Sequence, residues 1–238
     1  MKTSRGLSLI EVTIVLVIIG LLLGGLLIPL SAQMDQQKID LTKKRLEEIK
    51  EALLGFAIIY NRLPCVDTNG DGQENKDTTQ CDSNGEGYLP WKDLGVGRYD
   101  AWGNPFRYQT EEDFNNLLGF NANPTSGLRI KNRNDNNFTN TTDDSYVVAM
   151  IFSCGKNGRP DPTNPSPNTI DKNQTNDADG KRNTDASCSN QKVPGGQSKT
   201  YIHDVYVENE FDDILTWLSK NTLMNRLVAA GKWPPLVP

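Results

Sequence analysis

A single carboxylate lies at the start of the most apolar stretch in the chain. Glu11 directly precedes residues 12–30, and Thr13 carries the only polar side chain among those 19 residues. A carboxylate at the mouth of such a segment is costly unless it is paired, so Glu11 is a functional candidate. If a peptidase cut after Gly6, the new amine of Leu7 would lie about one helical turn from Glu11. The chemistry we expect is ion pairing with that amine, in the same chain or in a neighbouring one.

Four cysteines, Cys65, Cys81, Cys154 and Cys188, could form disulfides. No Cys-x-x-Cys spacing indicates a zinc site, and the membrane-directing N-terminus predicts an oxidising compartment. Three pairings are possible for four cysteines. We favour Cys65–Cys81 and Cys154–Cys188, because each closes one polar loop and a loop of that size contributes about 3 kcal/mol in the chain-entropy model. Free buried thiols are the alternative.

One acidic loop has the spacing of a calcium site. Asp67, Asn69 and Asp71 alternate, with Gly72 in the sixth position of the pattern. The twelfth position is Thr78, where the pattern requires Glu. Because Asp and Asn are also ordinary turn residues, calcium binding by these three side chains is a hypothesis, and the sequence requires no cofactor.

The sequence predicts no enzyme. Its one histidine, His203, lies in a predicted strand without a positioned nucleophile, which a catalytic triad would need. The net charge is −5 and no basic run exceeds three residues, which excludes a nucleic-acid binder held by bulk charge. Any other contact with nucleic acid is left open.

The apolar segment that follows Glu11 must position it, and this segment has the length of a membrane helix. Nineteen residues make roughly 28 Å of helix, close to the hydrocarbon thickness of a bilayer. Lys2 and Arg5 precede the segment and would stay on the cytoplasmic side. The segment is longer than the apolar core of a cleavable signal peptide, so it would remain as an uncleaved signal anchor. A plain signal anchor accounts for the apolar length and for the basic residues before it, but not for Glu11.

The residues around Glu11 resemble a known motif. Residues 5–12 read Arg-Gly-Leu-Ser-Leu-Ile-Glu-Val, which resembles the prepilin cleavage and methylation motif of type IV pilins and type II secretion pseudopilins. The chain departs from the usual pattern at Leu7, where Phe is commoner. The resemblance implies a leader peptide at 1–6, cleavage between Gly6 and Leu7 by a prepilin peptidase, N-methylation of Leu7, and Glu11 as the assembly residue.

The resemblance also implies a fold, a location and partners. The fold class is α+β, with a long N-terminal helix packed on a small antiparallel β-sheet head. The helix is transmembrane at 7–30 and amphipathic at 31–63, and the head covers 64–238. The location is the bacterial inner membrane, crossed once, with a periplasmic head that later joins a pilus or pseudopilus filament. The partners are other subunits, the prepilin peptidase/methyltransferase, inner-membrane lipid and the assembly platform.

The second half of the expected helix has one apolar face. Large apolar residues recur there at spacings of 3, 4, 3 and 4, and charged residues fill the other positions. The apolar positions are Leu46, Ile49, Leu53, Phe56 and Tyr60. Pro64 ends the helix after Arg62. A head domain must cover this face.

The head shows strand patterns, one terminal helix and one long polar loop. Predicted strands lie at 106–109, 128–130, 146–152, 201–207 and 211–218, and a short helix lies at 219–231. The run 146–152 has the continuous apolar character of a central strand. The 44 residues of 155–198 contain few aliphatic side chains and are predicted to form a long polar loop.

These features predict a structural subunit of a type IV pilus or type II secretion filament. A loop as long as 155–198 would be bulky on every subunit, which favours a minor pilin or a pseudopilin over a major pilin. The alternative function is a minor pilin that acts mainly as an adhesin or as a ligand- or DNA-binding tip module.

Overall fold

The computed structural model describes residues 8–82, 85–120, 124–132, 139, 146–156, 158, 200–206 and 211–232, apart from the side chains of 22–30 and 200. The chain divides into two compact units, Met1–Asp40 and Leu41–Pro238. One long helix, α1 (Leu9–Tyr60), supplies the described structure of the first unit and begins the second. It confirms the long helix predicted from the sequence, with slightly shorter bounds.

The first unit is helix from Leu9 onward. Glu11 lies in the first turn of α1, where the positive end of the helix dipole favours an acidic side chain. Among the described residues, no helix combines the length and the apolarity that a membrane crossing requires. The expected membrane segment 7–30 lies partly outside the described residues, since neither residue 7 nor the side chains of 22–30 are among them.

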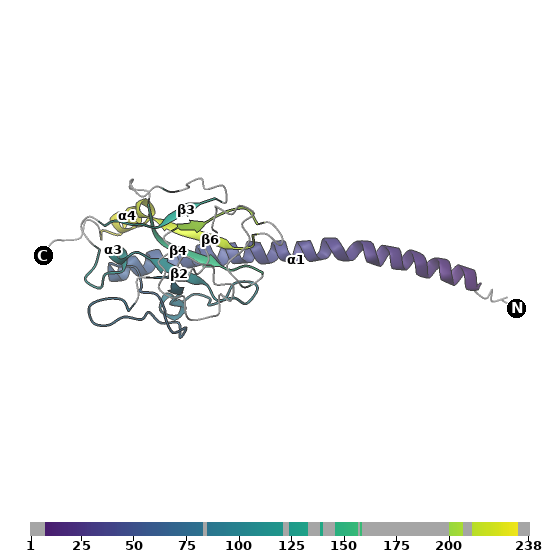
Figure 1. Ribbon diagram of the computed structural model, residues 1–238, viewed down its shortest axis with the longest axis horizontal. Helices are drawn as coiled ribbons and strands as arrows, with labels where there is room; N and C mark the ends of the chain where they lie inside the picture. Colours follow the sequence, from purple (N-terminus) through teal and green to yellow (C-terminus); the bar gives the residue numbers. More distant parts are fainter. Residues whose placement is uncertain are drawn as a thin grey trace, which may run out of the picture. The chain divides into compact units, whose positions relative to one another are not determined.

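In the second unit, the rest of α1 packs on a four-stranded antiparallel sheet (Figure 1). The sheet has the order β1-β2-β4-β6. Its strands are β1 (Gly87–Tyr88), β2 (Arg107–Thr110), β4 (Val147–Ser153) and β6 (Ile214–Ser219). The apolar face predicted for the helix is buried at Leu46, Ile49, Leu53 and Phe56, whereas Tyr60 is 57% exposed.

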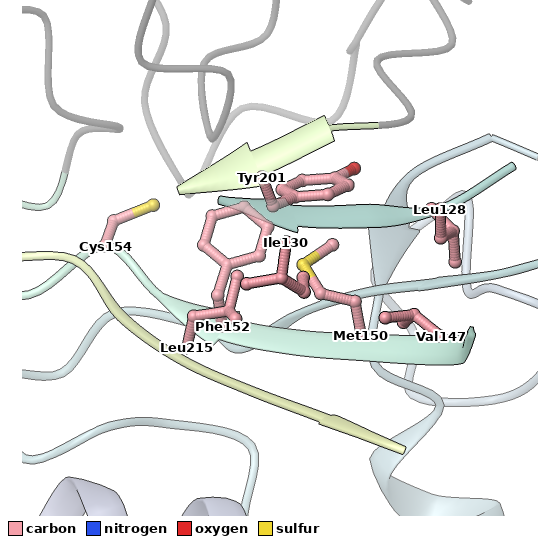
Figure 2. Packing of buried hydrophobic residues seen from close by; sticks show 8 residues of the cluster. All are labelled: Leu128, Ile130, Val147, Met150, Phe152, Cys154, Tyr201 and Leu215. Carbon is pink, nitrogen blue, oxygen red and sulfur yellow. The ribbon is translucent and has the colours of Figure 1, made fainter. Parts of the chain in front are cut away.

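Strand β4 is the centre of the fold, as its continuous apolar sequence predicts. It pairs with β2 on one edge and β6 on the other, and all seven of its residues are buried. A parallel pair, β3 (Arg129–Lys131) and β5 (Thr200–Ile202), contributes to a buried cluster with β4 and β6. Figure 2 shows the side chains of this cluster, which are Leu128, Ile130, Val147, Met150, Phe152, Cys154, Tyr201 and Leu215.

The described part of the head also contains three short helices. α4 (Lys220–Ala229) confirms the helix predicted at the C-terminal side, and the Ser219 hydroxyl caps it by accepting the Thr222 N–H at 3.2 Å. α2 (Trp91–Leu94) and α3 (Glu112–Asn115) have one turn each and carry no periodicity that would predict them.

Two predicted strands are shorter than expected. Strand β5 ends at Ile202 rather than continuing to Val207, and β6 begins at Ile214 rather than at Phe211. The backbone before β6 lies close to Gly155, since an added Cβ on Gly155 would lie 2.1 Å from the Asp212 carbonyl oxygen. Of the polar loop predicted at 155–198, only residues 155, 156 and 158 are among those described.

Candidate functional site

Glu11 lies on the first turn of α1 and faces its own helix start. The Ser8 carbonyl accepts the N–H groups of Glu11 at 3.0 Å and Val12 at 3.2 Å, so the helix begins directly after Ser8. The Ser8 N–H in turn donates to Oε2 of Glu11 at 3.4 Å. Gly6 and Leu7, the predicted cleavage residues, lie outside the described residues.

The helix around Glu11 is surrounded by exposed aliphatic side chains. They are between 42 and 84% exposed, on every side of the helix, and no described part of the chain covers them. They are Leu9, Ile10, Val12, Ile14, Val15, Leu16, Val17, Ile18, Ile19 and Leu21. Removing one such side chain from water contributes roughly 1.5–3 kcal/mol, so this surface requires an apolar environment.

Comparison with known families identifies this region. Residues 1–27 match the family described as the prokaryotic N-terminal methylation motif. The chain carries the type IV pilin and pseudopilin signature. The pilin signature implies processing by a prepilin peptidase, a membrane anchor and assembly with other subunits into a filament. Comparison of the whole chain with curated proteins and with solved structures gives no match.

Two of the four cysteines are joined within the head. Cys65 and Cys81 form a disulfide with a Cα–Cα distance of 5.4 Å, as the sequence predicts. Cys154 also takes part in a disulfide. Cys188 lies outside the described residues, so the pairing of Cys154 with Cys188 stays a prediction.

Peptide mapping under non-reducing conditions tests both pairings. We expect one linked peptide that joins Cys65 to Cys81 and a second that joins Cys154 to Cys188, because each disulfide closes a loop too polar to fold on its own. A linked peptide that contains Cys154 and either Cys65 or Cys81 would contradict this connectivity.

The acidic loop of the calcium hypothesis is held by its own backbone. Asp67 is fully buried, and its carboxylate accepts the N–H groups of Asn69 (3.1 Å), Gly70 (2.6 Å) and Gly72 (2.7 Å). Asp71 accepts an N–H of the Asn69 side chain at 3.2 Å. Within the described ranges, no three His, Cys, Asp or Glu side chains gather closely enough to hold a metal ion. The hydrogen bonds that Asp67 accepts hold the loop in its shape. Calcium binding by Asp67, Asn69 and Asp71 stays a prediction.

The loop closed by the Cys65–Cys81 disulfide also contains Glu74, which forms a buried ion pair that the sequence does not predict. Arg62 follows α1, and its Nη1 and Nη2 donate to the two carboxylate oxygens of Glu74 at 2.8 and 2.7 Å. Lys76 and the N–H of Cys65 donate to the same carboxylate. Burial raises the pKa of Glu74, but these hydrogen bonds outweigh it and lower the pKa from 4.5 to about 2. This ion pair ties the disulfide loop to the end of the helix.

A second buried ion pair joins Glu86, the residue before β1, to Arg107 of β2, and Tyr201 of β5 contacts the same carboxylate. Arg107 Nε donates to Oε1 of Glu86 at 3.0 Å, and the Tyr201 hydroxyl donates to Oε2 of Glu86 at 3.1 Å and also contacts Gln109. Burial raises the pKa of Glu86 despite the attraction of Arg107, and it raises the pKa of Tyr201. Because every partner belongs to the packing of the head, we interpret these groups as structural.

His203 has a structural setting. It directly follows β5, its backbone N–H donates to the Lys131 carbonyl at 2.7 Å, and its ring lies edge-on to Trp217 with the centroids 5.3 Å apart. Burial lowers the pKa of His203, although Asp204 opposes this effect.

Proposed function

We propose that this chain is a structural subunit, either a minor pilin or a pseudopilin, of a type IV pilus or type II secretion filament. It is made with the leader 1–6, cut between Gly6 and Leu7, and N-methylated on Leu7. Its apolar segment 7–30 holds it in the inner membrane until assembly. In the filament, Glu11 neutralises the terminal amine of a neighbouring subunit.

The observation that carries this proposal is the coincidence of the methylation motif with an exposed apolar helix. Residues 1–27 match the motif, and the described aliphatic side chains from Leu9 to Leu21 are exposed on every side of α1. A lipid bilayer provides the apolar environment before assembly, and the helices of neighbouring subunits provide it afterwards. Glu11, the one acidic residue of the first helical turn, is the charged group that must find a partner in both environments.

We expect the head to stay folded throughout assembly. Residues 41–60 of α1 pack with the sheet and carry buried apolar side chains, and polar contacts join them to β6 and α4. Glu47 accepts the Thr216 hydroxyl at 3.3 Å, and Glu51 pairs with Arg226 at 3.1 Å. The head can therefore move as one body when the apolar helix leaves the membrane.

Mass spectrometry of sheared filaments tests this function. The source is the native organism, and a strain that lacks the prepilin peptidase is the control. We expect the processed chain in the sheared fraction at low copy number relative to the main subunit, and no chain in that fraction from the control strain. If the chain were as abundant as the main subunit, the minor role would be contradicted. If it were absent both from type IV pili and from type II secretion filaments, the proposal itself would be contradicted.

A further inference from the structure

The exposed positions of α1 change character near the C-terminal end of the helix. Before residue 52 these positions are charged, as an amphipathic helix requires, at Lys44, Glu47, Glu48 and Glu51. From residue 52 to residue 60, by contrast, no side chain carries a charge, and the Tyr60 hydroxyl is the one polar group. A helix that is apolar on every side is normally buried on every side.

This apolar end of α1 is covered on one side only. Leu53, Leu54 and Ala57 are buried, whereas Ile59 on the opposite side of the helix is 72% exposed. Gly55 lies one turn before Ile59 on the same side. In the described part of the chain, a Cβ on Gly55 would meet no atom within 4 Å apart from its chain neighbours and the helix backbone. Gly55 and Ile59 thus form an open apolar surface, which we call the outer face of α1.

The last described segment of the chain runs along α1 towards this face. Thr216 of β6 contacts Glu47 at 3.3 Å. Ten residues later, Arg226 of α4 contacts Glu51 at 3.1 Å, one helical turn further along α1. From β6 to α4 the chain therefore advances in the direction of Ile59, which lies about 12 Å beyond Glu51 along the helix.

The end of α4 sets where the following residues begin. Gly231 has a φ of 67°, and the Lys232 N–H donates to the Leu227 carbonyl at 2.8 Å. In such a helix ending the chain turns back against the last helical turn. Residues 233–238, which lie outside the described residues, read Trp-Pro-Pro-Leu-Val-Pro and contain no charged side chain. An uncharged apolar segment thus begins next to an uncovered apolar face.

We propose that residues 233–238 pack on the outer face of α1 in the same chain and cover Gly55 and Ile59. Six residues in the polyproline conformation span about 19 Å, more than the roughly 12 Å of helix from Glu51 to Ile59. The missing side chain of Gly55 leaves room for a ring of this segment. The segment closes to other chains an apolar patch that the head would otherwise expose. This packing is a property of the single chain and does not depend on the proposed function.

The three prolines of the segment suit it to an apolar surface. Proline has no backbone N–H, so the segment brings few unpaired donors to the outer face. Its fixed φ also means that the segment loses little conformational freedom when it packs, which is why aromatic and apolar grooves bind such sequences in other proteins.

The packing is tested on the full-length chain in detergent, labelled with fluorotryptophan and observed by ¹⁹F NMR. Trp233→Phe assigns the Trp233 signal by its loss. We expect a soluble gadolinium chelate to broaden this signal little in the wild type and strongly in Ile59→Gln and Gly55→Gln, because each substitution places a polar side chain in the outer face. Gly55→Gln is the sharper variant, since the helix has open space at Gly55 and glutamine is the better helix former.

Val205→Gln is the matched control, because Val205 is 74% exposed, like Ile59, but belongs to the segment after β5. Its Trp233 signal should stay as protected as in the wild type, at every protein concentration. A wild-type signal broadened as strongly as that of Gly55→Gln, or protection that survives both substitutions in the outer face, would overturn the proposal. Protection that is lost on dilution would also overturn it, since the occupant of the face would then be the segment of a second copy.

Discussion

Replacing Glu11 by alanine is expected to keep the subunit out of filaments while its amount in the membrane stays normal. The change removes a charge from the edge of an apolar segment, so insertion into lipid becomes easier rather than harder. Inside a dry filament, however, the terminal amine of the neighbour loses its counter-charge, which costs about 3–5 kcal/mol. A role limited to the helix dipole would cost only about 0.3–1 kcal/mol, and assembly would persist.

The measurement compares three amounts for the wild type and Glu11→Ala: chain in the membrane, fraction processed, and chain in sheared filaments. Thr13→Ala is the matched control, because it lies two positions further along α1 and only loses a hydroxyl that donates to the Ile10 carbonyl at 2.8 Å. We expect this control to assemble. Normal incorporation of Glu11→Ala would refute the assembly role.

The second large effect is expected at Glu74 in the head. Glu74→Gln leaves Arg62 buried without a counter-charge, since the side chains of Arg62 and Glu74 are only 6 and 10% exposed. Breaking a buried pair by removing one partner lowers the free energy of unfolding by about 3–5 kcal/mol. Denaturant unfolding of the full chain in detergent, followed by a signal from the head, measures this loss.

Glu48→Gln provides the surface control for this substitution. Glu48 pairs with Lys44 at 3.9 Å, and both side chains are mostly exposed. Exposed pairs contribute about 0–1 kcal/mol, so this variant should unfold almost like the wild type. Similar unfolding free energies for Glu74→Gln and Glu48→Gln would show that the buried pair does not hold the disulfide loop.

The same carboxylate predicts an acid dependence. The pKa of Glu74 is about 2 in the folded chain, below its ordinary value of 4.5. The unfolded state therefore binds this proton first, so the stabilisation by Glu74 is complete above about pH 4.5 and disappears as the pH falls towards 2. Between these values, the wild type should lose its advantage over Glu74→Gln. A constant difference across this range would contradict the assignment.

The elements with local signals could be predicted from the sequence. The apolar spacing of Leu46, Ile49 and Leu53 predicts the helix face that packs on the sheet, and the continuous apolar run at 146–152 predicts the central strand. Glu11 stands out because a charge beside an apolar segment is a local anomaly. The Cys65–Cys81 disulfide follows from the short polar loop between its cysteines.

The contacts between distant segments could not be predicted in the same way. Arg62 and Glu74 are 12 residues apart, and Tyr201 reaches Glu86 across 115 residues, so nothing in the local pattern pairs them. Strand β5 is also short for a tertiary reason. The partner strand β3 ends at Lys131, whose carbonyl accepts the His203 N–H.

The mass of the N-terminal peptide of the chain, extracted from native membranes, tests the central claim most directly. Processing at the motif removes residues 1–6, and the loss of Lys2 and Arg5 changes the net side-chain charge from −5 to −7. We predict a mature chain that begins at Leu7 and carries one added methyl group on its amine. A chain that begins at Met1, or one that begins after Ala32, would contradict the pilin account.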